Sequence, residues 1–295
     1  MSEPSRSDLP RVLSPAKLRE WPLPVPTGGA KKSRGTVLVV GGSRGTPGAV
    51  LLAGTAALRA GAGILQLAAP EAVSTALAIH VPESLVIALP QTDEGAVSAG
   101  AAAALEDFCG GAEAVLIGPG LYDATESQRL VAALLELLGP ETAVALDAYA
   151  LRGLTEDSLR SVAGRVVLTP NMSEATRLLG RDSDEGDEPE ELARQLADRF
   201  AAVIALQGIV ASPDGPRWAD ESGHAGLGTS GSGDVLAGLI AGLLARGAGP
   251  EQAACWGTHL HATAGERLAA RIGRLGFLAR ELLDEAPLVL AELQA

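Results

Sequence analysis

The sequence has 295 residues, with 36 Asp and Glu against 23 Lys and Arg, and a formal net charge of −13. A chain this acidic repels nucleic acids and anionic membranes, so we exclude both as partners. Its two cysteines, Cys109 and Cys255, lie far apart and have no CxxC or metal-type spacing, so neither a disulfide framework nor a zinc site is predicted.

The N-terminal region contains no apolar segment typical of a signal peptide. The longest uninterrupted apolar stretch, Val235–Ala245, is too short to span a bilayer. We therefore expect a cytoplasmic protein. Residues 1–30 are rich in proline, serine and charge and predict an N-terminal arm, which is followed by a single domain at 31–295.

Short apolar runs bounded by glycine, proline or polar residues predict strands at 36–40, 64–68, 84–89, 114–117, 143–146, 165–168 and 203–206. Helical patterns alternate with them, at 49–60, 71–80, 99–109, 127–138, 173–179 and 189–200. A polar, hairpin-like stretch at 209–226 precedes three further helices, at 234–246, 251–270 and 277–285. This alternation predicts an α/β fold with a single doubly wound, mostly parallel sheet and helices on both faces.

Small polar motifs stand where the predicted strands end, at 41–43, 118–120, 146–148, 169–171 and 206–208. Each motif is also what an ordinary β→α turn uses, so none is specific by itself. Ligands of open α/β sheets bind outside the carboxyl ends of the strands. Together the motifs therefore predict a polar cleft at that edge of the sheet.

The stretch GTSGSGD at 228–234 stands before an apolar helix. Glycines let an anion approach the free N–H groups of a helix N-terminus, so Gly231, Ser232 and Gly233 predict a phosphate cradle. A P-loop would have lysine where Asp234 stands. Two roles remain open for Asp234: a base that accepts a proton from a hydroxyl beside the phosphate, or the N-cap of the helix.

A second motif, TPNMSE at 169–174, follows a predicted strand and opens a helix. We expect Asn171 to face the cleft. Glu174 has two open roles, because it can reach Mg²⁺ or a metal-bound water, or it can form a capping box with Asn171.

Two histidines, His259 and His261, lie two residues apart in a predicted helix. Residues at that spacing face different sides of a helix. We therefore predict neither a shared metal nor a catalytic histidine.

A GxGD motif that opens a helix, after an earlier NxxE element, resembles the ribokinase-like superfamily. Several stretches are similar, in the same order, to the ADP/ATP-dependent NAD(P)H-hydrate dehydratases of that superfamily. They are 37–63, 114–121, 146–151, 168–179, 228–244 and 259–269.

The resemblance implies an enzyme that uses ADP or ATP, with Mg²⁺, to dehydrate the S epimer of hydrated NADH or NADPH. In that chemistry the hydroxyl is phosphorylated and phosphate is then eliminated. The resemblance also implies a homo-oligomer. Because many family members are fused to an epimerase and this chain has no room for one, it implies a separate epimerase partner.

The resemblance assigns roles by position. Asp234 becomes the catalytic base, and Glu174 is the candidate metal ligand. The residues that would contact the hydrated substrate are Ala49, Gly120, Asn171 and Asp234. Those that would contact the nucleotide and its phosphates are Gln207, Gly208, Thr229, Gly231, Ser232 and Gly233.

Two positions depart from the family pattern: Asn171 stands in place of the usual histidine, and Gln207 in place of the usual lysine. Asparagine at this position is typical of the sugar kinases of the superfamily. Two alternatives follow, namely a ribokinase-like small-molecule kinase that phosphorylates a hydroxyl, and a nucleotide-binding homologue without activity.

Overall fold

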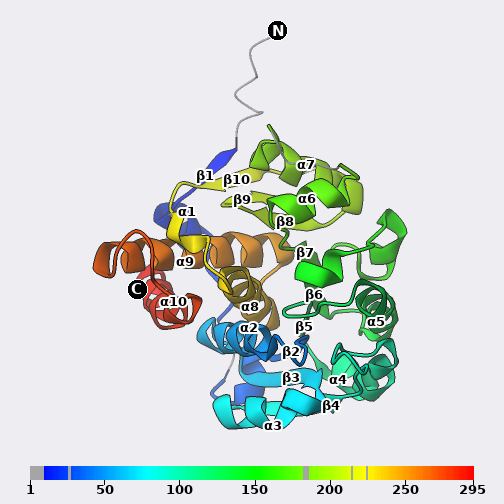
Figure 1. The fold of residues 1–295 in the computed structure, drawn as a ribbon. Helices are drawn as coiled ribbons and strands as arrows, with labels where there is room; N and C mark the ends of the chain where they lie inside the picture. Colours follow the sequence, from blue (N-terminus) through cyan, green and yellow to red (C-terminus); the bar gives the residue numbers. More distant parts are fainter. Residues whose placement is uncertain (1–9, 26–27, 182–185, 214, 224) are drawn as a thin grey trace.

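The structure is a computed structural model that describes residues 10–25, 28–181, 186–213, 215–223 and 225–295 (Figure 1). Its strands are β1 (Arg11–Leu13), β2 (Thr36–Val40), β3 (Ile64–Pro70), β4 (Ser84–Leu89), β5 (Ala114–Ile117), β6 (Ala143–Leu146), β7 (Val166–Leu168), β8 (Val203–Leu206), β9 (Ile209–Ala211) and β10 (Arg217–Asp220). They form one sheet in the order β1-β10-β9-β8-β7-β6-β5-β2-β3-β4.

Seven neighbouring strands of the sheet are parallel, and they are the seven strands expected from the sequence: β4, β3, β2, β5, β6, β7 and β8. The sheet then continues through antiparallel β9 and β10, which form the expected hairpin. The expected fold class is therefore confirmed, and all seven parallel strands end at one edge of the sheet.

The helices are α1 (Pro15–Glu20), α2 (Pro47–Arg59), α3 (Glu71–His80), α4 (Glu106–Gly111), α5 (Ala124–Leu137), α6 (Met172–Leu178), α7 (Pro189–Phe200), α8 (Ser232–Ala245), α9 (Pro250–Arg271) and α10 (Ala279–Gln294). Short 3₁₀ helices are η1 (Lys31–Arg34), η2 (Ala99–Leu105), η3 (Ala148–Leu151), η4 (Glu156–Val162) and η5 (Ala225–Leu227). None of the described helices is both long enough and apolar enough to cross a membrane.

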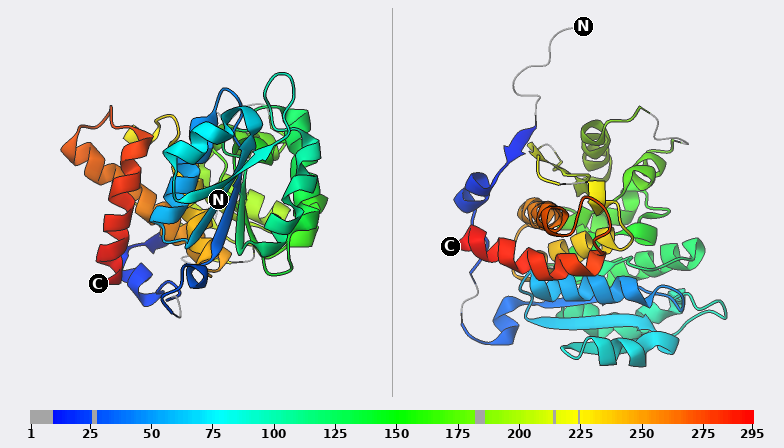
Figure 2. Two further views of the ribbon diagram at one scale, coloured as in Figure 1. Left: turned by 90° about the horizontal axis from the view of Figure 1, so that it is seen from below. Right: turned by 60° about the vertical axis from the view of Figure 1, so that its left-hand side comes forward.

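Helices cover both faces of the sheet (Figure 2). Helices α2, α3, α8, α9 and α10 pack on one face and α4 to α7 on the other. Alternation along the strands builds the two cores, since Val37 and Val39 join the first and Leu38 and Val40 the second.

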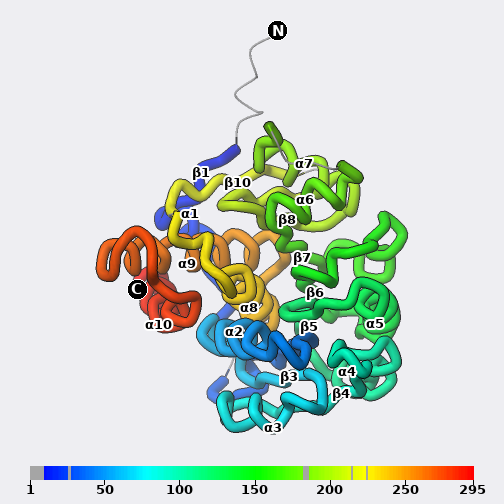
Figure 3. The backbone as a smooth tube through the Cα atoms, viewed as in Figure 1, coloured from blue at the N-terminus to red at the C-terminus, as the bar shows by residue number. Residues whose placement is uncertain are grey.

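Helix α8 is held against α2 by glycines (Figure 3). A Cβ at Gly238 would lie 2.1 Å from the carbonyl oxygen of Ala53, and a Cβ at Gly242 would lie 2.4 Å from that of Ala57. Only hydrogen fits in these gaps, so the two backbones touch. This close contact fixes the position of the N-terminus of α8.

Helix α10 is longer than predicted. The sequence pattern predicts an end at residue 285, just before Pro287, but the helix continues to Gln294 with that proline inside it. Proline removes one backbone hydrogen bond. The buried side chains Val289, Leu290 and Leu293 lie beyond it, and their burial outweighs that loss.

The described part of the N-terminal arm packs on the sheet and helices. Strand β1 pairs in parallel with β10, and Leu18 and Leu23 are buried. The carbonyl oxygen of Trp21 accepts hydrogen bonds from Trp256 Nε1 at 3.0 Å and from Gln252 Nε2 at 3.1 Å. The division between arm and domain at residue 30 stays a prediction.

Candidate functional site

The seven parallel strands all end at one edge of the sheet, and the predicted polar motifs follow five of them, β2, β5, β6, β7 and β8. The chain proceeds from β2 outward through β3 and β4, and then returns to the other side of β2 to build β5 to β8. The strand order therefore reverses between β2 and β5. Open α/β sheets bind their ligands beside such a reversal, which places the candidate site here.

The loops after β2 and β5 touch each other. Thr46 Oγ1 donates a hydrogen bond of 2.7 Å to the carbonyl oxygen of Gly120. Gly120 has a φ of 73°, and a Cβ there would lie 2.9 Å from the Cβ of Ala49. The structure thus brings the predicted substrate residues Ala49 and Gly120 together, and it leaves no room for a side chain at Gly120.

Helix α8 begins at Ser232, and its N-cap is Gly231, with a left-handed φ of 87°. Asp234 is therefore the third residue of the helix, and the alternative that it is the N-cap is wrong. No described side chain caps α8, so N–H groups of its first turn are available. Gly233 is exposed, and a Cβ there would meet no described atom within 4 Å. The first turn is thus open to a ligand.

The segment before α8 continues this open turn. Ser232 N donates a hydrogen bond of 3.2 Å to the carbonyl oxygen of Thr229, which is half-buried. The structure therefore brings the predicted phosphate residues together around one helix N-terminus: they are Thr229, Gly231, Ser232 and Gly233.

Two carboxyl groups interact through their charges at the site, the buried Asp147 and the half-buried Asp234. Burial raises the pKa of Asp234 to about 6. Burial also raises the pKa of Asp147, which ends β6, to about 7, and the charge of Asp234 adds to that shift. Since Asp147 titrates at the higher pH, it does so beside an already ionised Asp234. At neutral pH, Asp234 is therefore mostly a carboxylate and able to accept a proton.

Asp147 is a site residue that the sequence reasoning missed. Its Oδ1 accepts a hydrogen bond of 2.8 Å from Thr169 Oγ1 at the end of β7, and the charge of Glu174 also raises its pKa. The available signal was an acid directly after a buried strand. What the sequence lacked was the spatial proximity to Asp234, which lies in a distant helix.

Asn171 and Glu174 form the capping box of α6. Asn171 N donates to Glu174 Oε2, and Glu174 N donates to Asn171 Oδ1, both at 2.9 Å. The capping alternative for Glu174 is thus confirmed. One carboxylate oxygen remains for another ligand, so its role at a metal stays a prediction.

Gln207 and Gly208 form the two-residue turn between antiparallel β8 and β9, with φ values of 47° and 82°. Positive φ at both positions is typical of a type I′ hairpin turn. The motif at 206–208 is thus an ordinary turn, but it joins two strands rather than a strand and a helix. Gln207 is exposed and lies at the same edge of the sheet as Thr169, because β8 is parallel to β7.

The two histidines of α9 have different partners, as their spacing predicts. His261 Nε2 lies 2.8 Å from Ser232 Oγ, and burial lowers the pKa of His261 to about 4, so the ring is neutral. His259 Nδ1 pairs with the buried Asp220 Oδ2 at 2.6 Å. His261 therefore orients the hydroxyl of the first residue of α8, a contact that the sequence reasoning did not find.

Comparison with known sequences gives the family. The sequence profile of the NAD(P)H-hydrate dehydratases matches residues 37–288. The chain is 44% identical over 288 residues to the ADP-dependent (S)-NAD(P)H-hydrate dehydratase of Xanthomonas campestris, covering 96% of this chain and 97% of that protein. The chain belongs to the NAD(P)H-hydrate dehydratase family.

A longer relative is the bifunctional NAD(P)H-hydrate repair enzyme of Moorella thermoacetica, which is 39% identical over 90% of this chain. This member of the NAD(P)H-hydrate dehydratase family spans only 51% of that enzyme. The present chain is thus similar in length to the Xanthomonas relative and about half as long as the bifunctional Moorella enzyme.

Solved structures agree with this family. The ADP/ATP-dependent NAD(P)H-hydrate dehydratase of Bacillus subtilis, co-crystallised with ATP and Mg²⁺, has a TM-score of 0.79 at 28% identity, over 96% of this chain and 99% of that one. A ribokinase-like protein of Enterococcus faecalis has a TM-score of 0.78 at 25% identity, over 97% of both chains. The fold is therefore ribokinase-like.

The carboxylates Asp147, Glu174 and Asp234 are the donors available to a metal in this NAD(P)H-hydrate dehydratase family member. No group of three or more His, Cys, Asp or Glu side chains in the described ranges is arranged to hold a metal directly. Mg²⁺ usually keeps several waters and binds through one or two carboxylates. The donor set therefore fits Mg²⁺ and does not fit a fully protein-coordinated ion.

Proposed function

We propose that this protein dehydrates the S epimer of hydrated NADH or NADPH, with ADP or ATP as co-substrate, and so restores the intact nicotinamide nucleotide. The observation that carries the proposal is the first turn of α8. It presents uncapped N–H groups and an open Gly233 beside Asp234, whose pKa is about 6. A base beside an anion site is what phosphoryl transfer to a hydroxyl requires.

In this proposal the two substrates meet at the N-terminus of α8. The backbone N–H of Gly233 binds the phosphate that is transferred, and Thr229, Gly231 and Ser232 shape the loop around it, since Ser232 N is already bonded to the Thr229 carbonyl. The exposed turn at Gln207 and Gly208 borders the adenine nucleotide. The hydrated nicotinamide lies across the cleft, against the residues Ala49, Gly120 and Asn171.

Asp234 then acts as the catalytic base. Its carboxylate takes the proton of the substrate hydroxyl while the hydroxyl oxygen forms a bond to the terminal phosphorus, and AMP or ADP leaves. The carbon–oxygen bond next breaks with loss of a proton from the neighbouring carbon, and phosphate is released. Mg²⁺, held through water near Glu174 and Asp147, would neutralise phosphate charge.

The dehydratase assay tests the proposal. Hydrated NADH is mixed with the protein and Mg²⁺, with ADP, with ATP or with no nucleotide, and the absorbance of NADH is followed. We expect recovery only when a nucleotide is present. Consumption of ATP with a panel of alcohols but no recovery of NADH would instead support a small-molecule kinase, the alternative that Asn171 favours. Nucleotide binding without either reaction would support an inactive homologue.

We also propose that a separate epimerase supplies the S epimer. The Moorella relative is bifunctional and about twice as long as this chain, so a second activity accompanies the dehydratase in that protein. A homo-oligomer remains part of the proposal, and light scattering of the purified protein tests it.

A further inference from the structure

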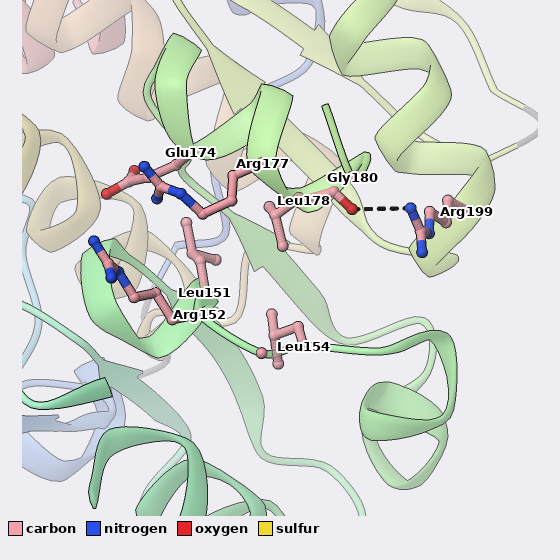
Figure 4. A pocket seen from close by; sticks show the side chains of 9 residues that line it. Leu151, Arg152, Leu154, Glu174, Arg177, Leu178, Gly180 and Arg199 are labelled. Atoms are coloured by element: carbon pink, nitrogen blue, oxygen red, sulfur yellow. Dashed lines mark hydrogen bonds between the residues drawn. The ribbon is translucent and has the colours of Figure 1, made fainter. Parts of the chain in front are cut away.

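A pocket of about 240 Å³ lies between η3, the loop after it and α6 (Figure 4). Three arginines line it, Arg152, Arg177 and Arg199, together with one acidic side chain, Glu174. Arg152 and Arg177 lie on the same side, and Arg199 lies opposite them. The pocket therefore has an excess of positive charge in a protein whose formal net charge is −13.

Arg152 and Arg177 pair with no acidic side chain among the described residues. The guanidinium of Arg152 stacks over the ring of Tyr149 at 4.2 Å, and Arg177 Nη2 donates to Ser173 Oγ at 3.2 Å. Neither forms an ion pair with a carboxylate in the part of the chain that the structure describes. Stacking holds the half-buried Arg152 in place without neutralising it.

Arg199 differs from this pair. Its Nη1 donates to the carbonyl oxygen of Leu178 at 2.9 Å, and its Nε lies 3.4 Å from Glu156 Oε1. Its charge already has partners, so the unmatched charge of the pocket belongs to Arg152 and Arg177. Two guanidinium groups on the same side of one pocket, neither of them in an ion pair with a described residue, suit a phosphate.

The position of the pocket selects the ligand. Glu174 belongs both to the pocket and to the capping box with Asn171, so the pocket adjoins the cleft on the side of β6 and α6. The nucleotide, by contrast, is placed at α8 and the β8–β9 turn. A phosphate that reaches Arg152 and Arg177 therefore comes from the hydrated dinucleotide.

We infer that Arg152 and Arg177 form a subsite for a phosphate group of the hydrated dinucleotide, an inference that rests on the proposed function. Two phosphates of the substrate share this chemistry: the pyrophosphate, which NADH and NADPH hydrates both carry, and the 2′-phosphate, which only NADPH hydrate carries. The subsite would fix the dinucleotide away from the reacting ring.

The test compares Arg152→Gln, Arg177→Gln and the double variant with the wild type. Arg160→Gln is the matched control, because it removes the same charge from an exposed arginine that pairs with Asp157 outside the pocket. We expect the double variant to raise the KM for the dinucleotide about tenfold, as the loss of charged hydrogen bonds does. The kcat, the KM for ADP or ATP, the melting temperature and the control should not change.

Each pattern of KM values decides something. A rise for NADPH hydrate alone identifies the 2′-phosphate, and a rise for both hydrates identifies the pyrophosphate. An unchanged KM for both hydrates, or a rise for ADP or ATP alone, would overturn the inference. If the wild type shows no dehydratase activity, the proposed function fails, and calorimetric binding of intact NADPH and NADH to the same variants then decides the subsite by itself.

Discussion

The first turn of α8 and the rest of that helix use glycine for opposite purposes. In the body of the helix, Gly238 and Gly242 make room for the backbone of α2, and any side chain there would overlap with it. In the first turn, Gly233 faces open space. The same residue type thus anchors one part of α8 and leaves the other free for a ligand.

This difference teaches how a flexible sequence can form a rigid site. The stretch GTSGSGD contains three glycines, yet the helix that it opens is buried over most of its length and held by α2. The N–H groups of the first turn are therefore fixed before a ligand arrives, which is the condition for electrostatic preorganisation. Substitutions in the two parts should consequently have separable effects on stability and on activity.

The largest loss of stability is expected from Gly238→Ala. The new Cβ would lie 2.1 Å from the carbonyl oxygen of Ala53, a backbone atom, so α2 and α8 must separate. Overpacking of this kind costs about 2 kcal/mol or more, above the gain in helix propensity of about 1 kcal/mol. Thermal unfolding measures the loss, and a melting temperature equal to that of the wild type would show that α2 and α8 are not in close contact.

A smaller and opposite effect is expected from Gly233→Ala. The added methyl group meets no described atom, so the melting temperature should stay the same or rise slightly. The methyl group would occupy the space in which the phosphate must lie, so kcat/KM should fall at least about tenfold. Steady-state kinetics with ADP and ATP measure this, and full activity would show that the phosphate does not approach Gly233.

Asp147→Asn is expected to change the stability only at higher pH, and to raise it. In the unfolded chain Asp147 loses its proton near its ordinary pKa of 3.8, but in the folded protein it keeps the proton up to about pH 7. The folded state binds more protons in this window, so the free energy of unfolding falls as the pH rises through it.

The asparagine can still accept the hydrogen bond from Thr169, but it removes this pH dependence. We expect equal melting temperatures of variant and wild type near pH 4, and a higher one for the variant at pH 8. If the melting temperatures of variant and wild type changed with pH in the same way across this range, Asp147 would not be held in a buried environment beside a like charge.

The sequence predicts the parallel part of the fold well, because its strands are short apolar runs bounded by glycine, proline or polar residues. Strands β2, β4, β5, β6 and β8 begin and end where predicted. Strand β1 was missed because Arg11–Leu13 is short and half exposed, and only its pairing with β10 makes it a strand. The type of turn at Gln207 could not be assigned from the sequence, because β→α and hairpin turns use similar residues.

The site is less predictable for a physical reason. The phosphate cradle at the start of α8 and the NxxE motif are each a continuous stretch of sequence, so the local roles of their residues can be inferred from spacing. The contacts of Asp147 with Thr169, and of Ser232 with His261, join residues that are far apart in the sequence. Such pairs depend on strand order and helix packing, which no local pattern encodes.

The most direct test of the account is the rate of NADH recovery by Asp234→Asn. The amide cannot accept the hydroxyl proton, so we expect kcat to fall at least about 100-fold. Nucleotide binding should persist, and the melting temperature should not fall, because the variant removes a carboxylate whose burial is unfavourable. A kcat close to that of the wild type, in a variant with the same fold, would contradict the assignment of Asp234 as the base.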